Sequence, residues 1–117
     1  MDSLQLLKTA VKSADDKKAY NIKVLDIREL TTLADYFVIC HGTSFPQMRA
    51  IFDEVEEKLK EQEVLVHNAG AEESNQWMLM DYGDVIIHIF NEESREFYGI
   101  ENLWADAETV DISEFIS

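Results

Sequence analysis

The sequence predicts a single α/β domain, in which a mixed sheet of about five strands carries helices mainly on one face. Three observations lead to this prediction. Amphipathic helical patterns alternate with short apolar strand patterns along the chain. The 117 residues suffice for one core, and no linker or repeat divides them. The hydrophobic content of 46% is typical of a folded domain rather than of a disordered acidic segment.

The first half of the chain contains two predicted helices and two predicted strands. Residues 3–18 form an amphipathic helix, and residues 22–27 form a short strand. Residues 35–40 are so continuously apolar that we expect this strand at the centre of the sheet, buried on both faces. The clearest helix begins at Ser44, which forms a capping-box pattern with Gln47. Its predicted buried stripe comprises Met48, Ile51, Phe52, Val55 and Leu59.

The second half is predicted to contain an edge strand, a hairpin and a short helix. Residues 64–67 are the candidate edge strand, and residues 69–76 form a polar loop. Strands at residues 77–81 and 84–90 then pair around a two-residue loop, Tyr82-Gly83. Asn91 caps a short helix that Gly99 ends. We expect the domain to cover residues 1–110, followed by an acidic C-terminal tail, residues 111–117, with three candidate packing residues, Ile112, Phe115 and Ile116.

The hairpin is the most informative feature, because its register sorts the side chains into two faces. With the loop at Tyr82-Gly83, Asp81 lies opposite Asp84 and Trp77 lies opposite His88. One face is then purely apolar and belongs to the core: Met78, Met80, Val85, Ile87 and Ile89. The other face is mixed: Trp77, Leu79, Asp81, Asp84, Ile86, His88 and Phe90. Two interpretations remain open: a docking surface with a tryptophan anchor and an acidic rim, or ordinary core beneath another helix.

The charge of the chain restricts its partners. A formal net charge of -14 disfavours nucleic acid or an anionic membrane surface as the main contact and favours a basic partner. The single cysteine, Cys40, excludes an intrachain disulfide. We find neither a signal-peptide pattern nor an apolar run of about 20 residues, so we expect a cytoplasmic protein without a membrane contact.

A catalytic site is the main functional alternative. Gly42-Thr43-Ser44 follows a predicted central strand and opens a helix, as in a phosphate-binding turn, and Asp81 with Asp84 could hold a divalent cation for nucleotidyl or phosphoryl transfer. However, no lysine or arginine occurs between Lys60 and Arg95 to stabilise a triphosphate. We therefore expect no enzymatic activity and no cofactor.

The remaining reactive side chains also lack a catalytic or metal-binding pattern. The three histidines, His41, His67 and His88, and the cysteine match no metal-ligand spacing, so we expect no metal site. Cys40 and His41 do not form a nucleophile pair, because adjacent residues of a strand point to opposite faces. Cys40 is expected to be a small core residue.

Several motifs resemble those of one known family. They are Asp35-Tyr36-Phe37-Val38-Ile39 with Gly42-Thr43-Ser44, Gln47-x-Arg49-Ala50-Ile51, Trp77-x-Leu79-x-Asp81-Tyr82-Gly83-Asp84-Val85-Ile86-Ile87-His88-Ile89-Phe90, and Arg95-x-Phe97-Tyr98 with Leu103-Trp104. In this order and spacing they are similar to the ribosomal silencing factor family (RsfS, also called Iojap), from the first helix to about Val110. The resemblance implies a domain akin to the nucleotidyltransferase fold without a catalytic role.

The resemblance also implies a mechanism and a set of partner-binding residues. Family members bind the large ribosomal subunit through its ribosomal protein number fourteen (uL-fourteen) and block subunit joining, which lowers translation under nutrient limitation. A role in large-subunit biogenesis is also ascribed to them. The family's hairpin motif implies this partner-binding set: Trp77, Leu79, Asp81, Tyr82, Asp84, Ile86 and His88. His41 departs from the family pattern, in which a small hydroxyl residue is common at this position.

Two further possibilities follow from the predicted mixed face. An exposed apolar sheet face favours a homodimer when the protein is free, and such a dimer must open if it uses the same face. The acidic surface would also suit a binding module that antagonises a basic protein outside the ribosome. Neither possibility involves the membrane or sequence-specific nucleic acid.

Overall fold

The computed structural model describes residues 2–71 and 76–116, and over these residues the strands form one six-stranded mixed sheet. The strands are β1 (Tyr20–Asp26), β2 (Tyr36–Gly42), β3 (Asn68–Ala71), β4 (Trp77–Asp81), β5 (Val85–Asn91) and β6 (Glu108–Val110). Their order in the sheet is β3-β4-β5-β2-β1-β6, with β2 parallel to β5 and the other neighbours antiparallel. The predicted α/β class is confirmed, and the additional strand is β6, which is too short to show a periodic pattern.

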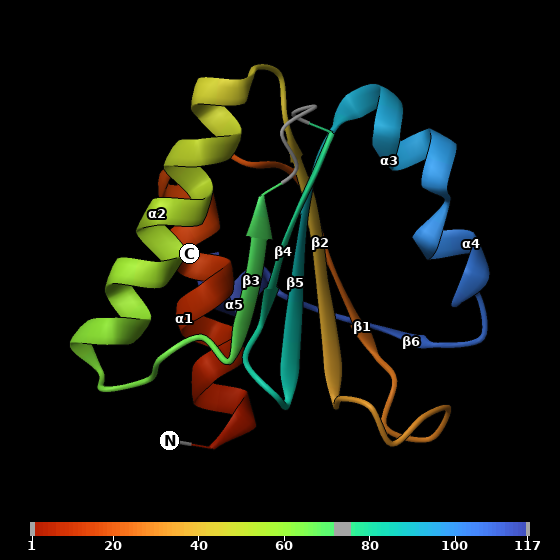
Figure 1. Cartoon of the computed structure of the whole chain (residues 1–117). Helices are drawn as coiled ribbons and strands as arrows, with labels where there is room; N and C mark the ends of the chain where they lie inside the picture. The colour runs from red at the N-terminus through yellow and green to blue at the C-terminus, as the bar shows by residue number, and fades with distance from the viewer. Residues whose placement is uncertain (1, 72–75, 117) are drawn as a thin grey trace.

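The helices lie on both faces of the sheet, and the two long helices share one face. The helices are α1 (Ser3–Asp16), α2 (Phe45–Glu61), α3 (Glu92–Tyr98), α4 (Ile100–Leu103) and α5 (Ser113–Ile116). In Figure 1, α1, α2 and α5 lie on one side of the strands, whereas α3 and α4 lie on the other. The prediction that helices lie mainly on one face is therefore confirmed for the long helices.

The predicted signals at the helix ends are present. The hydroxyl of Ser44 accepts from the backbone N–H of Gln47 at 3.2 Å, which caps the first turn of α2. The side chain of Gln47 accepts in return from the backbone N–H of Thr43 at 2.7 Å. Asn91 caps α3 through Ser94, and Gly99 ends it with φ of 57°, a left-handed conformation that glycine adopts without steric cost.

The predicted edge strand is wrong in its position. Strand β3 comprises residues 68–71, and these pair with β4, whereas residues 64–67 precede the strand. Val64 and Val66 instead pack against the core as partly buried side chains. These two valines therefore contact the core without belonging to a strand. Residues 69–71 of the predicted polar loop belong to β3, and residues 72–75 lie outside the described residues.

The hairpin register differs from the prediction by two residues. Trp77 pairs with Phe90 and Asp81 pairs with Ile86, so the loop consists of Gly83 and Asp84. The physical reason is the backbone of Gly83, whose φ of 87° suits the first position of a tight two-residue hairpin loop. Because strand side chains alternate with a period of two, this shift leaves the strand residues on their predicted faces, and only Asp84 moves from the predicted strand into the loop.

Two apolar cores lie on opposite faces of the sheet. The larger core lies beneath α1 and α2 and includes the predicted stripe of α2 and the predicted apolar hairpin face. The smaller core lies on the other face: Leu25, Ile27, Ala34, Phe37, Ile39, Phe90 and Ile100. The C-terminal segment also contributes, because α5 packs against α1 and Ile112, Phe115 and Ile116 are partly buried on the larger core.

Candidate functional site

The mixed hairpin face lies on the side of the sheet that α1 and α2 leave uncovered. Trp77, Leu79 and Asp81 of β4 project to this side together with Ile86 and His88 of β5. His88 is buried, whereas the other four side chains are half-buried. The face is therefore neither a dry core nor a fully open surface. In the following we call the half-buried side chains Trp77, Leu79, Asp81 and Ile86 the hairpin face.

Trp77 is held in place by aromatic neighbours and one hydrogen bond. Its indole N–H donates to Nδ1 of His88 at 3.1 Å. Its ring stacks on Phe90 with centroids 5.1 Å apart and lies 4.9 Å from the ring of Tyr98 on α3. Since the indole donor is already satisfied within the chain, Trp77 offers a partner an apolar ring rather than a hydrogen bond.

His88 supports Trp77 from below the surface. Only 4% of this residue is exposed, and burial lowers the pKa of its imidazole to about 4, so the ring is neutral at pH 7. Because Nδ1 accepts from Trp77, the ring proton is on Nε2, which has no hydrogen-bond partner among the described residues. His88 therefore acts on the surface through Trp77 rather than by its own exposed atoms.

Tyr82 does not belong to the hairpin face. Its side chain projects to the opposite side, where it is 4% exposed and forms part of the larger core. The shifted hairpin loop explains this correction, since Tyr82 continues the alternation of Met78 and Met80 rather than lying in the loop. Burial raises the pKa of its hydroxyl to about 12, and a nearby carboxylate of Glu56 adds to this shift.

The two aspartates occupy the turn end of the hairpin but do not face each other. Asp81 accepts from the backbone N–H of Gly83 at 2.7 Å, which stabilises the loop. Asp84 is an exposed loop residue whose backbone carbonyl accepts from the N–H groups of Asp35 and Tyr36. The predicted pairing of Asp81 with Asp84 is therefore wrong. Along β4, Asp81 lies four residues from Trp77, or roughly 13 Å at about 3.3 Å per residue.

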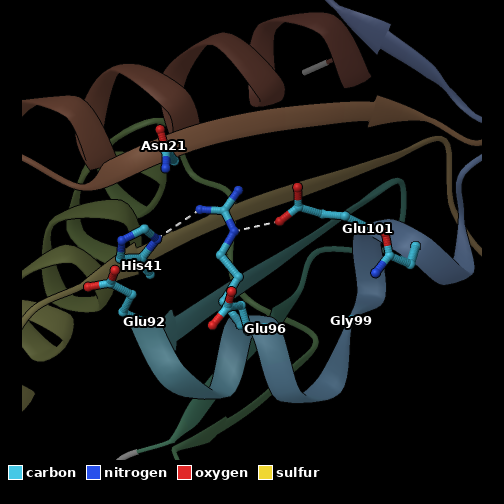
Figure 2. A pocket seen from close by; sticks show the side chains of 8 residues that line it. Asn21, His41, Glu92, Glu96, Gly99 and Glu101 are labelled. Atoms are coloured by element: carbon cyan, nitrogen blue, oxygen red, sulfur yellow. Dashed lines mark hydrogen bonds and ion pairs between the residues drawn. The ribbon is translucent and has the colours of Figure 1, made fainter.

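A polar cleft next to α3 is the second place where ionisable groups gather. Figure 2 shows its lining side chains, which come from β1, β2, α3 and α4: Asn21, His41, Glu92, Arg95, Glu96, Gly99, Glu101 and Asn102. The guanidinium of Arg95 donates from Nε to Glu101 and approaches Nδ1 of His41 at 2.9 Å. It also donates to the backbone carbonyl of Tyr20 at 3.3 Å. Arg95 thus ties α3 to the adjacent strands.

Among the residues that line this cleft, the cationic side chain is Arg95, and its carboxylate partner Glu101 lies within the same cleft. Burial alone would raise the pKa of the Glu101 carboxyl, but hydrogen bonds and charge from Arg95 and Lys23 hold it below its usual value. Burial and the charge of Arg95 lower the pKa of His41, whose ring stacks on Tyr20. His41 therefore serves as a neutral acceptor for Arg95. The cleft positions α3 and shows no unused cationic group for an anionic substrate.

The turn that begins α2 already forms a hydrogen bond with a side chain of the chain itself. The N–H of Thr43 is bonded to the side chain of Gln47, and the hollow beside this turn is lined by Glu92, Glu93 and Glu96. These carboxylates would repel a phosphate group. Within the described ranges 2–71 and 76–116, no three histidine, cysteine or acidic side chains gather as a metal site would require.

Cys40 is an inert core residue, as the sequence predicted. It lies in the larger core, and complete burial raises the pKa of its thiol to about 12, although the charge of Arg95 acts in the opposite direction. His41 projects from the same strand to the other side of the sheet.

Over residues 2–71 and 76–116, no helix has the length and apolar character needed to cross a bilayer.

Comparison with known proteins identifies the family to which the chain belongs. The family described as ribosomal silencing factor during starvation, RsfS, matches residues 1–117 of the chain. The chain belongs to this family. The ribosomal silencing factor RsfS of Halalkalibacterium halodurans is 38% identical over 117 residues, which cover both chains completely. That of Bacillus subtilis is 38% identical over 112 residues, or 96% of this chain and 95% of the relative.

Solved structures of relatives share the RsfS fold. A crystal structure of a protein from Chromobacterium violaceum matches with a TM-score of 0.86 and 34% identity, covering 90% of this chain and 88% of the other. A second crystal structure, from Bacillus halodurans, matches with a TM-score of 0.82 and 36% identity, covering 93% and 99%. The resemblance inferred from motifs along the chain is therefore confirmed over residues 1–117.

Proposed function

We propose that this RsfS-family chain is a translational repressor without enzymatic activity that binds the large ribosomal subunit in the cytoplasm. Its partner there is the large-subunit ribosomal protein number fourteen (uL-fourteen). By occupying this protein, the chain sterically prevents the small subunit from joining and represses translation under nutrient limitation. The observation that carries the proposal is the incompletely covered hairpin face with a preorganised Trp77.

The geometry supports a distinct role for each part of the surface. Trp77, Leu79 and Ile86 supply half-buried apolar area for a matching patch on the partner, as interface anchors do. Asp81 and Asp84 lie at the loop, where their charge favours lysine or arginine of a basic protein. His88 is buried and supports this surface from within through its hydrogen bond with Trp77, whereas Tyr82 is buried on the opposite face.

The same face also favours an interaction between two copies of the chain when the protein is not bound to the ribosome. Half-buried aromatic and aliphatic side chains on an open sheet face favour self-association into a homodimer. Such a dimer would compete with ribosome binding if both use the hairpin face. The competition predicts that the dimer dissociates as the large subunit is added, which analytical ultracentrifugation with a labelled chain measures directly.

Sedimentation through a sucrose gradient tests the proposed function. Purified protein is mixed with isolated large and small subunits at low and at physiological salt. We expect co-migration with the large subunit and fewer joined particles as the protein concentration rises. Absence from the large-subunit fraction at low salt would refute ribosome binding. A pull-down dominated by a basic protein from outside the ribosome would favour the antagonist alternative instead.

A further inference from the structure

Phe97 on α3 is the most exposed of the large hydrophobic side chains recorded for the described residues, with 82% of its surface accessible. It projects from a helix whose other side is firmly attached to the protein. Ser94 is buried, and Arg95 reaches into the polar cleft to contact Glu101 and His41. Because these contacts fix the rotation of α3, the outward direction of Phe97 is built into the fold and does not result from a loosely attached helix.

The exposed phenyl ring continues the aromatic surface of the hairpin. Phe97 packs edge-to-face on Tyr98 with centroids 5.2 Å apart, and Tyr98 lies 4.9 Å from Trp77. The hydroxyl of Tyr98 also donates to the side chain of Gln76, directly before β4, at 3.3 Å. A row of rings thus leads from Trp77 across Tyr98 to Phe97. In Figure 1, α3 lies near the end of the sheet where β4 begins and β5 ends.

The charges next to this ring specify the chemistry of a partner. Glu93 precedes Phe97 by four residues and therefore lies on the same side of the helix, whereas Glu96 lines the polar cleft beside Arg95. The side chain of Glu93 is exposed. An exposed apolar ring with a carboxylate beside it complements an apolar hollow bordered by lysine or arginine.

We propose that the outward side of α3 is a second contact of the docking surface, with Phe97 as its apolar anchor and Glu93 as its acidic rim. The occupant is an apolar hollow, bordered by lysine or arginine, on the same basic ribosomal protein. This proposal rests on the proposed function and deepens it. It places the aromatic anchors on two elements, β4 and α3, with carboxylates at both ends of the surface.

A matched pair of variants tests this contact. Phe97→Ala removes the exposed ring of α3, and Leu65→Ala removes a comparably exposed side chain, 67% accessible, between α2 and β3. Neither side chain is buried, so both variants are expected to melt within about 2 °C of the unmodified protein. In a titration of large subunits, we expect Phe97→Ala to weaken binding on the order of tenfold, as anchor truncations do, and Leu65→Ala to leave it unchanged.

The outcomes separate this inference from the function on which it rests. If the unmodified chain does not bind large subunits, the proposed function and the second contact both fail. If it binds, Trp77→Ala weakens binding, and Phe97→Ala binds as tightly as Leu65→Ala, the second contact alone is wrong. The variant Glu93→Gln gives an independent readout. We expect its binding to depend less steeply on salt, and an unchanged salt dependence contradicts the acidic rim.

Discussion

The two faces of the hairpin consist of alternating residues of the same strands, yet their surroundings are opposite. Met78, Met80 and Ile87 are completely buried beneath the long helices. Trp77, Leu79 and Ile86 project to the other face, where α3 and α4 cover only part of the sheet, and remain half-buried. One face thus contributes mainly stability, whereas the other retains accessible apolar surface. The contrast shows that helix placement, rather than strand composition, decides which apolar side chains can take part in recognition.

The largest effect is expected from truncation in the covered face. Ile87→Ala removes a side chain without exposed surface and should lower the free energy of unfolding by about 2–5 kcal/mol. Urea denaturation followed by circular dichroism measures this loss. Binding to large subunits, corrected for the folded fraction, should be unchanged. A loss of stability below about 1 kcal/mol would show that the two faces are packed alike.

Acid should destabilise the protein through His88. Its folded pKa of about 4 lies below the ordinary value of 6.5, so the unfolded state binds more protons between these values. This contribution to stability is complete above about pH 6.5 and is lost as the pH falls towards 4, by on the order of 3 kcal/mol. The free energies of unfolding of the unmodified chain and of His88→Phe are measured at several pH values, and their difference isolates the contribution of His88. A pH-independent difference would contradict a buried neutral imidazole.

Two substitutions at Trp77 separate its recognition from its packing. Trp77→Ala removes the ring and should weaken binding to large subunits by about 2 kcal/mol or more. Trp77→Phe keeps an aromatic ring but leaves Nδ1 of His88 without its donor. This change should lower the free energy of unfolding by about 1 kcal/mol and should weaken binding less than Trp77→Ala does. The two readouts are a binding titration and thermal unfolding. Equal losses of binding and stability for Trp77→Ala would assign this side chain to the core.

The smallest effect is expected at the hairpin loop. Asp84→Asn removes an exposed carboxylate, so stability should change by less than about 0.5 kcal/mol. Binding should weaken by at most about 1 kcal/mol, and mainly at low salt, because exposed charges are screened. Association rates at two salt concentrations measure this effect. A loss that is as large at high salt would indicate a desolvated ion pair rather than a rim contact.

Local signals in the sequence predicted much of this structure correctly. Period-3.6 spacing identified the buried stripe of α2, and Ser44, Asn91 and Gly99 marked helix ends through interactions with their near neighbours. The continuous apolar run identified β2 as a strand buried along its whole length. Alternation sorted the hairpin side chains into the correct faces even though the predicted register was wrong. Each of these features depends on residues close together in the chain.

The sequence by itself thus determined the α/β class, the N-caps of α2 and α3, the end of α3 and the two faces of the hairpin strands, because short-range sterics and periodicity encode them. Only the tertiary structure decided three other features. Tyr82 lies in the core, and His88 is a buried acceptor for the indole N–H of Trp77. Arg95 fixes the orientation of α3, so Phe97 projects outward. These depend on contacts between elements far apart in sequence, which no local pattern contains. The extent of the exposed surface is therefore a property of the packed helices and strands together.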